Sequence, residues 1–301
     1  MDWNKELTHC MLCPRKCGKN RTAGEYGFCG MSAELRIARA ALHFWEEPCI
    51  SGSVGSGTVF FSGCPLRCVY CQNFAVARAE SAKKVTPDRL ARIFVELQSK
   101  GAANINLVTP DHYVPQIIGA LVSARADGLS LPVVYNTSSY VMPHTVDMMK
   151  GHADIYLADY KYHSADVAAR YSHAADYPVA ARAAIARMTA QCGSCEFDSD
   201  GMMRRGVIVR HLVLPGHVAE AKRALRYIYE TYGDSVYISI MSQFTPCTDL
   251  DAYPEINRRL TAAEYDRVID FAVKIGVKNA FVQDGKAASE SFIPMFDYEG
   301  V

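Results

Sequence analysis

Short apolar runs alternate with amphipathic stretches over most of the chain after residue 57. The apolar runs predict strands at 58–62, 104–109, 132–137, 154–159, 207–214, 236–241 and 279–283. Several are apolar at consecutive positions, which is typical of parallel strands covered on both faces. The stretches between them have helical periodicity and predict helices over about 86–100, 113–127, 143–150, 165–190, 216–232 and 261–275.

This alternation predicts an α/β fold built as a full or partial (β/α) barrel. A doubly wound open sheet is the alternative architecture. Residues 1–50 have little periodicity and many cysteines, so we expect a small Cys-rich, metal-binding N-terminal extension there. The barrel core is then expected over residues 51–301.

The composition is that of an ordinary globular chain. Half of the 301 residues are hydrophobic, and 32 Lys and Arg residues balance 32 Asp and Glu residues. This excludes a mainly disordered chain, and the zero net charge argues against nucleic-acid binding driven by basic charge. No apolar run approaches the roughly 18–20 residues that span a bilayer. The first residues lack the pattern of a signal peptide, so we expect a cytoplasmic protein without a membrane role.

The cysteines are the unusual feature of the composition. The chain has 11, and eight of them lie in the first 71 residues. An odd number in a chain of this size and expected location favours metal or redox chemistry over disulfides.

Three of these cysteines form a motif directly after the first predicted strand, Cys64-Pro-Leu-Arg-Cys68-Val-Tyr-Cys71. The spacing lets three thiolates converge on one point. A structural zinc site uses four protein ligands, whereas three leave one iron of a [4Fe–4S] cluster open to another ligand. The alternative is a zinc site that takes a further cysteine, such as Cys49, as its fourth ligand.

The motif, with Tyr70 as its aromatic residue, resembles the signature of the radical S-adenosylmethionine (radical SAM) superfamily. Further segments resemble a branch related to pyruvate formate-lyase activating enzymes, which activate glycyl radical enzymes. These segments are Cys10-Met-Leu-Cys13-Pro-Arg-Lys-Cys17-Gly, Gly24-Glu-Tyr-Gly-Phe-Cys29-Gly, Leu42-His-Phe-Trp-Glu-Glu-Pro-Cys49-Ile-Ser-Gly and Arg210-His-Leu-Val-Leu-Pro-Gly216. The resemblance implies a barrel of the radical SAM type with a [4Fe–4S] cluster that binds S-adenosylmethionine. Reductive cleavage then gives a 5′-deoxyadenosyl radical that abstracts hydrogen from a substrate.

The resemblance also implies which residues contact the cofactor. They are Tyr70 in the motif, Asn104 and Asn106 on the second strand, Asn136, Thr137 and Ser138 on the third, Asp159 and Lys161 on the fourth, and Arg210 on the fifth. A lysine at a strand end is suited to binding the methionyl carboxylate. The family's usual Gly-Gly-Glu after the second strand is absent, and Asn104-Ile-Asn-Leu-Val-Thr-Pro-Asp111 occupies that region.

A second group of cysteines, Cys10, Cys13, Cys17 and Cys29, provides four possible ligands within 20 residues. Four thiolates suit structural zinc or a fully ligated second Fe–S cluster, and the spacing does not choose between them. Four thiols without a metal are the further alternative. We expect one shared site, separate from the cluster at Cys64, Cys68 and Cys71.

The leading hypothesis is therefore a radical SAM enzyme related to glycyl radical enzyme activases. It implies an electron donor such as flavodoxin or ferredoxin, and a polypeptide or small-molecule substrate. The second hypothesis is modification of a peptide or metabolite by an enzyme with an auxiliary cluster. The third is a non-catalytic zinc or Fe–S protein.

Overall fold

The structure is a computed structural model that describes residues 4–80, 82–283 and 294–301. Its strands are β1 (Leu35–His43), β2 (Ser56–Phe61), β3 (Lys83–Val85), β4 (Ile105–Val108), β5 (Val133–Thr137), β6 (Ile155–Asp159), β7 (Glu196–Phe197), β8 (Met203–Leu212), β9 (Tyr237–Met241) and β10 (Ala280–Val282). Its α-helices are α1 (Asn4–Thr8), α2 (Pro48–Ser51), α3 (Phe74–Ala77), α4 (Pro87–Ser99), α5 (Val114–Ala126), α6 (Pro143–Met148), α7 (Ala165–Ser172), α8 (Tyr177–Cys192), α9 (Val218–Tyr232) and α10 (Ala262–Lys274). No helix within these ranges is both long enough and apolar enough to cross a membrane.

The strands form one twisted sheet in the order β10-β9-β8-β6-β5-β4-β2-β1-β3, with β7 paired to β8. Strands β2, β4, β5, β6, β8, β9 and β10 are parallel, and β1 and β3 add to the β2 edge in antiparallel pairs. The end strands β10 and β3 do not pair with each other within the described ranges, so the sheet does not close into a full barrel. The predicted α/β fold is confirmed, and its arrangement is consistent with a partial barrel.

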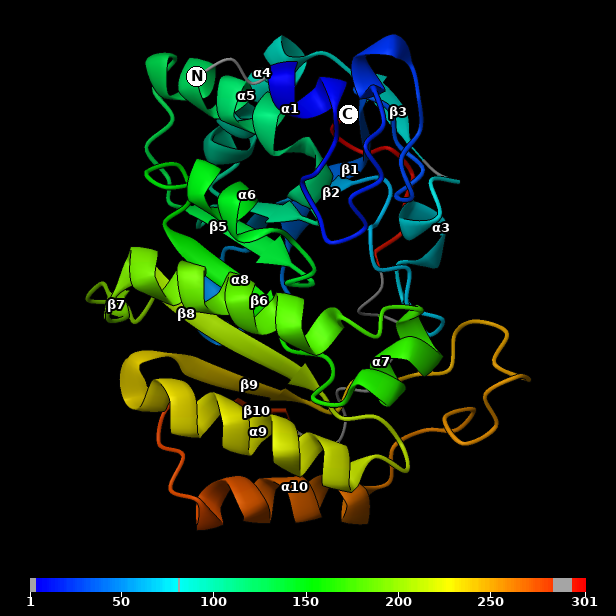
Figure 1. Cartoon of the computed structure of the whole chain (residues 1–301). Helices are drawn as coiled ribbons and strands as arrows, with labels where there is room; N and C mark the ends of the chain where they lie inside the picture. The colour runs from blue at the N-terminus through cyan, green and yellow to red at the C-terminus, as the bar shows by residue number, and fades with distance from the viewer. Residues whose placement is uncertain (1–3, 81, 284–293) are drawn as a thin grey trace.

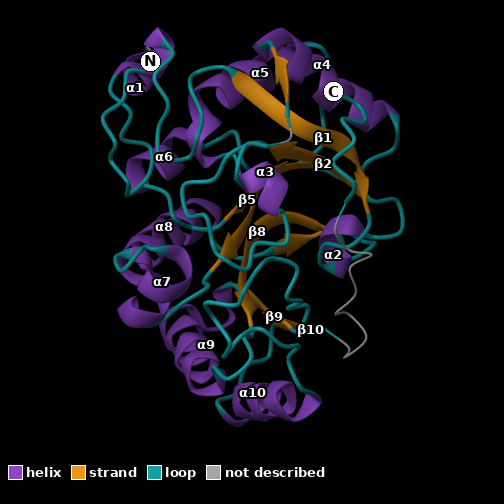
Figure 2. Ribbon diagram, turned by 90° about the vertical axis from the view of Figure 1, so that its right-hand side faces the viewer, coloured by secondary structure: helices purple, strands orange, loops and turns teal. Residues whose placement is uncertain are grey.

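Helices cover the outer side of the sheet, and the loops that follow the parallel strands gather at one edge (Figure 1). Figure 2 looks onto this edge, with α3 in front of the strands. The covering explains why β5 and β6 are buried along their whole length. Because the carboxyl ends of parallel strands meet at this edge, residues from distant parts of the sequence are collected there.

The predicted helix over 165–190 is wrong as a single element, since it is divided into α7 and α8. His173, at the end of α7, has a left-handed backbone with φ 48°, which cannot continue an α-helix. Pro178 then lies in the first turn of α8, where a residue without an amide hydrogen is tolerated.

The segment after β1 enters the inside of the barrel, with Glu46 near the strand-end loops and helix α2 at the opposite end. Helix α2 buries Cys49 and Ile50 against Val134, Leu157 and Ile208, which lie on the inner face of β5, β6 and β8. Cys49 is thus separated by the barrel interior from the three-cysteine loop after β2. Cys49 therefore does not supply a fourth ligand there, and the zinc alternative stays open only with another cysteine.

The predicted extension over residues 1–50 is continuous with the sheet, because β1 lies within it and pairs with β2 from His43 to Ile37. Residues 9–34 are mostly loops and turns, with one short 3₁₀ helix at Arg21–Ala23. The division of the chain into an extension and a core stays a prediction.

Candidate functional site

A cavity of about 220 Å³ lies at the carboxyl edge of the sheet. Its wall contains three thiols from the loop after β2 and polar side chains from β5, β6 and β8. The predicted site residues in this wall are Cys64, Cys68, Tyr70, Cys71, Asn136, Thr137, Ser138, Asp159, Lys161 and Arg210. The fold therefore brings together most of the residues that the sequence nominates.

The three-cysteine loop is fixed by contacts with distant segments. The loop turns at Gly63, where φ is +87° and a Cβ would lie 2.5 Å from Met31 Cγ, so only glycine fits. Further along, the Val69 amide donates to the Tyr171 carbonyl (2.9 Å), and the Thr248 hydroxyl donates to the Val69 carbonyl (2.7 Å). The positions of the thiols are thus set by the tertiary structure rather than by the loop alone.

The electrostatic environment of these thiols suits a bound metal cluster. Burial raises the pKa of Cys64 to about 11 and, together with the neighbouring thiols, raises the pKa of Cys71 still further above its ordinary value. Thiolates this deeply buried need a nearby cation, which the irons of a cluster provide. Three thiols facing one cavity fit a [4Fe–4S] cluster with one iron left open.

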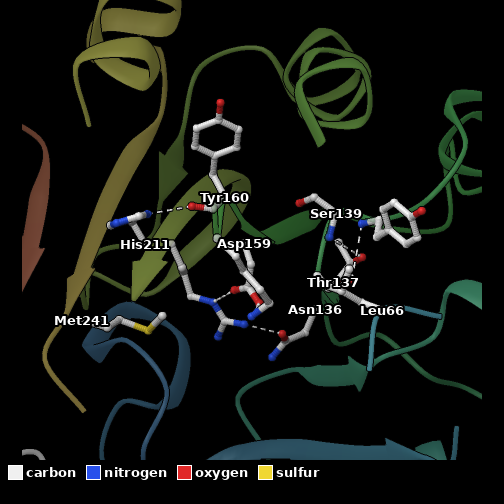
Figure 3. A network of polar contacts seen from close by, with 12 residues as sticks. Leu66, Asn136, Thr137, Ser139, Asp159, Tyr160, His211 and Met241 are labelled. Carbon is white, nitrogen blue, oxygen red and sulfur yellow. Dashed lines mark hydrogen bonds and ion pairs between the residues drawn. The ribbon is translucent and has the colours of Figure 1, made fainter. Parts of the chain in front are cut away.

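A charged network lies in the same cavity wall as the thiols, and Figure 3 shows two of its residues, Asn136 and Asp159. Arg210 donates from Nε to Asp159 Oδ1 (2.8 Å), from Nη2 to Asn136 Oδ1 (2.6 Å) and from Nη1 to Glu46 Oε2 (3.0 Å). Lys161 Nζ donates to Asp159 Oδ2 (2.7 Å). The side chains of Arg210 and Asp159 are only 12% and 11% exposed, so water screens this network little.

The carboxylate of Asp159 is ionised in this network. Burial alone would raise its pKa, but the charges of Arg210 and Lys161 outweigh burial and hold the pKa below its usual range. Lys161 stays protonated for the reciprocal reason, because the neighbouring Asp159 raises its pKa despite burial. The cavity therefore holds two cations beside the three thiols, each paired with a carboxylate, and a bound anionic group would share them with Asp159 and Glu46.

Asp111 lies beneath the cavity, in the segment that replaces Gly-Gly-Glu. Its Oδ1 accepts hydrogen bonds from the hydroxyls of Thr137 (2.7 Å) and Tyr135 (2.8 Å), and burial raises its pKa to about 6. The neighbouring His112 contacts the Ser62 carbonyl through Nε2 at 2.8 Å, and burial with a nearby arginine lowers its pKa to about 3. A neutral histidine held in this way positions the end of β2.

Two of the nominated asparagines do not line the cavity. Asn104 lies at the amino end of β4, where it accepts from Ser56 Oγ (2.6 Å) and donates to the Ile50 carbonyl (2.7 Å). It is therefore at the wrong edge of the sheet to touch the cofactor. Asn106 donates from Nδ2 to Glu46 Oε1 (3.1 Å), so it acts on the network through Glu46.

The aromatic residue of the motif, Tyr70, has its ring packed edge-on against Tyr162, Tyr171 and Phe244. Its hydroxyl accepts a hydrogen bond from the Tyr162 hydroxyl at 2.7 Å. The tyrosine thus anchors the loop in an aromatic cluster beside the cavity.

Sequence reasoning missed Glu46. This residue accepts hydrogen bonds from Arg210 and from the amides of Asn106 and Asn136, and so joins β4, β5 and β8. The available signal was the adjacent acid pair in Trp45-Glu46-Glu47-Pro48, within a stretch otherwise noted only for its resemblance.

A second cavity of about 300 Å³ shares Trp45, Glu46, Arg210, Met241 and Gln243 with the first and extends toward β10. Glu47 lies in its wall, 8% exposed, and its Oε2 has no hydrogen-bond partner within the described part of the chain. Burial raises the pKa of this carboxyl. The second cavity thus offers an unpartnered polar group next to the charged network.

Besides Cys49, the remaining cysteines occupy three places: the N-terminal segment, the amino end of the sheet and, for Cys247, the side of the three-cysteine loop, where its thiol lies 3.9 Å from the Cys71 carbonyl oxygen. Cys10, Cys13 and Cys29 are buried and Cys17 is half-buried; burial and the charges of the other three thiols raise the pKa of Cys13 to about 12. Cys192 and Cys195 direct their thiols at backbone carbonyls near the amino end of the sheet. Within the described ranges, no three His, Cys, Asp or Glu side chains lie close enough to hold one metal ion.

Residues 58–178 match the model of the Radical SAM superfamily. Over 281 residues the chain is 27% identical to the uncharacterized protein MJ0674 of Methanocaldococcus jannaschii, covering 88% of this chain and 75% of that relative.

Solved structures share the fold. SuiB of Streptococcus suis, bound to its precursor peptide SuiA, has a TM-score of 0.50 and 11% identity over 73% of this chain and 46% of its own. Methylornithine synthase (PylB) has a TM-score of 0.51 and 14% identity over 81% and 65%. The FeFe-hydrogenase maturase HydG of Carboxydothermus hydrogenoformans has a TM-score of 0.50 and 10% identity over 78% and 56%. The chain thus spans about half to two-thirds of the length of these structures.

Residues 58–178, which carry the three-cysteine loop and strands β2 to β6, are thus similar to the radical SAM superfamily, and the solved structures share the fold of the chain.

Proposed function

We propose that this protein is a radical SAM enzyme of the branch related to pyruvate formate-lyase activating enzymes. The observation that carries the proposal is the single cavity in which three thiols face the pair Asp159–Lys161 and the guanidinium of Arg210. The three thiols are suitable ligands for a cluster with one open iron, and the side chains of Lys161 and Arg210 are suitable partners for the carboxylate of a bound cofactor.

In this function Cys64, Cys68 and Cys71 hold three irons of the cluster. When bound, the cluster and S-adenosylmethionine supply a 5′-deoxyadenosyl radical that abstracts a hydrogen atom from the substrate. Lys161 pairs with the methionyl carboxylate, and Asp159 orients the Lys161 ammonium at 2.7 Å. The cavity walls exclude water from the reacting groups.

In this proposal Asn136 and Ser138 contact the ribose side of the cofactor from the end of β5, and Thr137 lies between them. The structure supports this role for Asn136, whose amide is held between Arg210 and Glu46. The Thr137 hydroxyl is engaged with Asp111, so its contribution is to fix the turn that presents Ser138.

The substrate in this proposal is a polypeptide, as for the activases of glycyl radical enzymes. The second cavity supports a substrate path between β10 and Trp45, next to the cofactor space. Flavodoxin or ferredoxin is the proposed electron donor. The second candidate is modification of another peptide or of a metabolite. The same cavity favours it, because Glu47 Oε2 in its wall has no hydrogen-bond partner in the described ranges and suits a polar group of a small substrate.

Anaerobic reconstitution with iron and sulfide tests the proposal. The wild type should release 5′-deoxyadenosine from S-adenosylmethionine with dithionite, and Cys68→Ala should abolish the release. Cys195→Ala, at the opposite edge of the sheet, is the matched control and should retain it. A Cys68→Ala protein that cleaves S-adenosylmethionine at the wild-type rate would contradict the assignment of Cys68 as a cluster ligand. A glycyl radical signal formed in a polypeptide encoded beside this gene would separate activase from modifying enzyme.

A further inference from the structure

The second cavity contains more acidic than basic groups. Its wall includes the carboxyls of Glu46 and Glu47 and, among the described residues, a single cation, Arg210. That guanidinium is already paired, because it lies 3.0 Å from Glu46 Oε2 and 2.8 Å from Asp159 Oδ1. With Lys161 bound to Asp159, the charged network and Glu47 together hold three carboxyl groups and two cations. The region thus has one acidic group more than it has cations.

The surplus carboxyl is that of Glu47. It is 8% exposed, its Oε2 accepts no hydrogen bond from the described residues, and it forms no ion pair with any of them. Burial raises the pKa of Glu47, and neither the charge of Arg210 nor a hydrogen bond with Ser239 offsets that effect. A buried carboxyl with an unpaired oxygen is unfavourable whether it is ionised or neutral. Glu47 is therefore complementary to a group that binds in the cavity.

The rest of the wall offers hydrogen-bond acceptors. The side-chain oxygen of Gln283 accepts one hydrogen bond, from the Ser242 amide at 2.9 Å, and that of Gln243 accepts one from Gln283 Nε2 at 3.2 Å. An amide oxygen can accept two, so each has capacity left. A wall of this kind suits a ligand group that only donates, such as an ammonium, which has three donors and no acceptor.

The aromatic part of the wall also favours a cation. Trp45 and Phe281 lie in the same wall as Glu47. The faces of aromatic rings attract cations, and a carboxylate beside such rings strengthens the attraction. An anion would instead meet two acidic groups and a guanidinium that is already paired. A neutral donor would satisfy Glu47 Oε2 but would leave the surplus acidic group without a counter-charge.

The second cavity is placed to hold one end of a substrate whose other end reaches the three-cysteine loop. The two cavities share part of their wall, including Met241 and Gln243, and the thiols of that loop lie in the wall of the first. The volume of about 300 Å³ is at the lower end of the roughly 300–1,000 Å³ of small-molecule sites. It therefore suits the end of an aliphatic chain rather than a large ring system.

We propose that Glu47 binds an ammonium group at the end of an aliphatic chain of the substrate, with the carbon that loses hydrogen placed in the first cavity. Glu47 is then a residue that determines substrate specificity. Lysine side chains of a polypeptide and small primary amines both carry this group. The selection of a substrate rests on the proposed function, whereas the binding of an ammonium in the second cavity does not.

Binding of three probes to the reconstituted protein, measured by saturation-transfer NMR titration at pH 7, tests the ammonium site without enzyme activity. N-acetyl-lysine methylamide and pentylamine carry the charge, and N-acetyl-norleucine methylamide has an aliphatic side chain without it. Both amines should bind at least about tenfold more tightly than the norleucine compound. Tighter binding of the lysine compound than of pentylamine supports a polypeptide substrate, and the reverse order supports a small amine. Equal affinities for charged and uncharged probes, or no binding of the amines, would overturn the ammonium site.

Glu47→Gln keeps the shape of the side chain and removes its charge. This variant should bind both amines at least about tenfold more weakly and the norleucine compound as before. Glu230→Gln, at an exposed position of α9, is the matched control and should bind all three probes like the wild type. Amine binding unchanged in Glu47→Gln would overturn the role of this residue, and the wild-type comparison does not depend on how the variant folds. A wild type that prefers the amines but releases no 5′-deoxyadenosine would count against the proposed function alone.

Discussion

Arg210 is the residue whose removal should disturb the charged network most. Its guanidinium makes three hydrogen bonds of 2.6–3.0 Å, two of them to carboxylates, and its side chain is 12% exposed. Arg210→Met has a similar length and no charge. It leaves Asp159 and Glu46 buried with less compensation.

The expected loss in the free energy of unfolding follows from the partners that remain. Breaking a buried ion pair typically costs about 3 to 5 kcal/mol. Because Asp159 keeps Lys161 and Glu46 keeps two amide donors, we expect the lower end, about 3 kcal/mol at pH 7.

The loss should depend on pH. In the wild type the pKa of Asp159 lies below its unfolded value of about 3.9, so its charge stabilises the fold at all pH above that value and the contribution is lost as pH falls through the lower folded pKa. In Arg210→Met burial is no longer offset by the guanidinium, so the folded pKa moves up. The difference between the two proteins should therefore shrink as pH falls through the raised pKa of Asp159 in Arg210→Met.

Urea unfolding of the metal-free proteins, followed by circular dichroism from neutral pH down into the carboxyl titration range, measures both quantities. Arg187→Met is the control, because it breaks an ion pair with Asp147 whose side chains are 53% and 39% exposed, and it should change stability far less. A loss for Arg210→Met no larger than that of the control, or one that does not shrink with acidity, would refute the reasoning.

Three further outcomes are expected. Lys161→Ala should weaken the binding of S-adenosylmethionine to the reconstituted protein by more than about tenfold, whereas Lys100→Ala on the surface should not; coinciding calorimetric isotherms would show that the lysine does not contact the cofactor. Glu46→Gln replaces a carboxylate that accepts three hydrogen bonds and should lower the free energy of unfolding by about 1 to 3 kcal/mol in urea titrations; an unchanged midpoint would contradict its bridging role. S-adenosylmethionine should change the fluorescence of Trp45, which borders both cavities, in a Trp3→Phe background, and a constant spectrum would place the cofactor elsewhere.

Much of the architecture could be predicted because its signals are local. Consecutive apolar positions predict the parallel strands, and the residues at each strand end can be read directly. Parallel strands present their carboxyl ends at one edge, so Asp159, Lys161 and Arg210 could be expected to meet beside Cys64 and its partners. The division of the predicted helix has a local signal in Pro178, whereas the left-handed backbone of His173, whose carbonyl accepts a hydrogen bond from Arg15, has none.

The parts of the site that could not be predicted depend on long-range packing. Asn104 and Asn106 are two residues apart in the sequence. Because β4 begins at Ile105, Asn104 lies at the amino edge of the sheet and contacts Ile50, whereas Asn106 lies within the strand and contacts Glu46. Glu46 itself enters the network because β1 runs antiparallel to β2 and sends the following segment into the barrel.

The sequence by itself therefore determined the α/β class, the three-thiol motif and the strand-end residues, because each depends on periodicity or spacing within a short stretch. Only the tertiary structure decided that the N-terminal cysteines dock on the three-cysteine loop, that Arg21 is buried beside Cys10, and that Glu46 joins the charged network. Those contacts link segments far apart in the chain, and the packing free energy that forms them is a property of the whole fold.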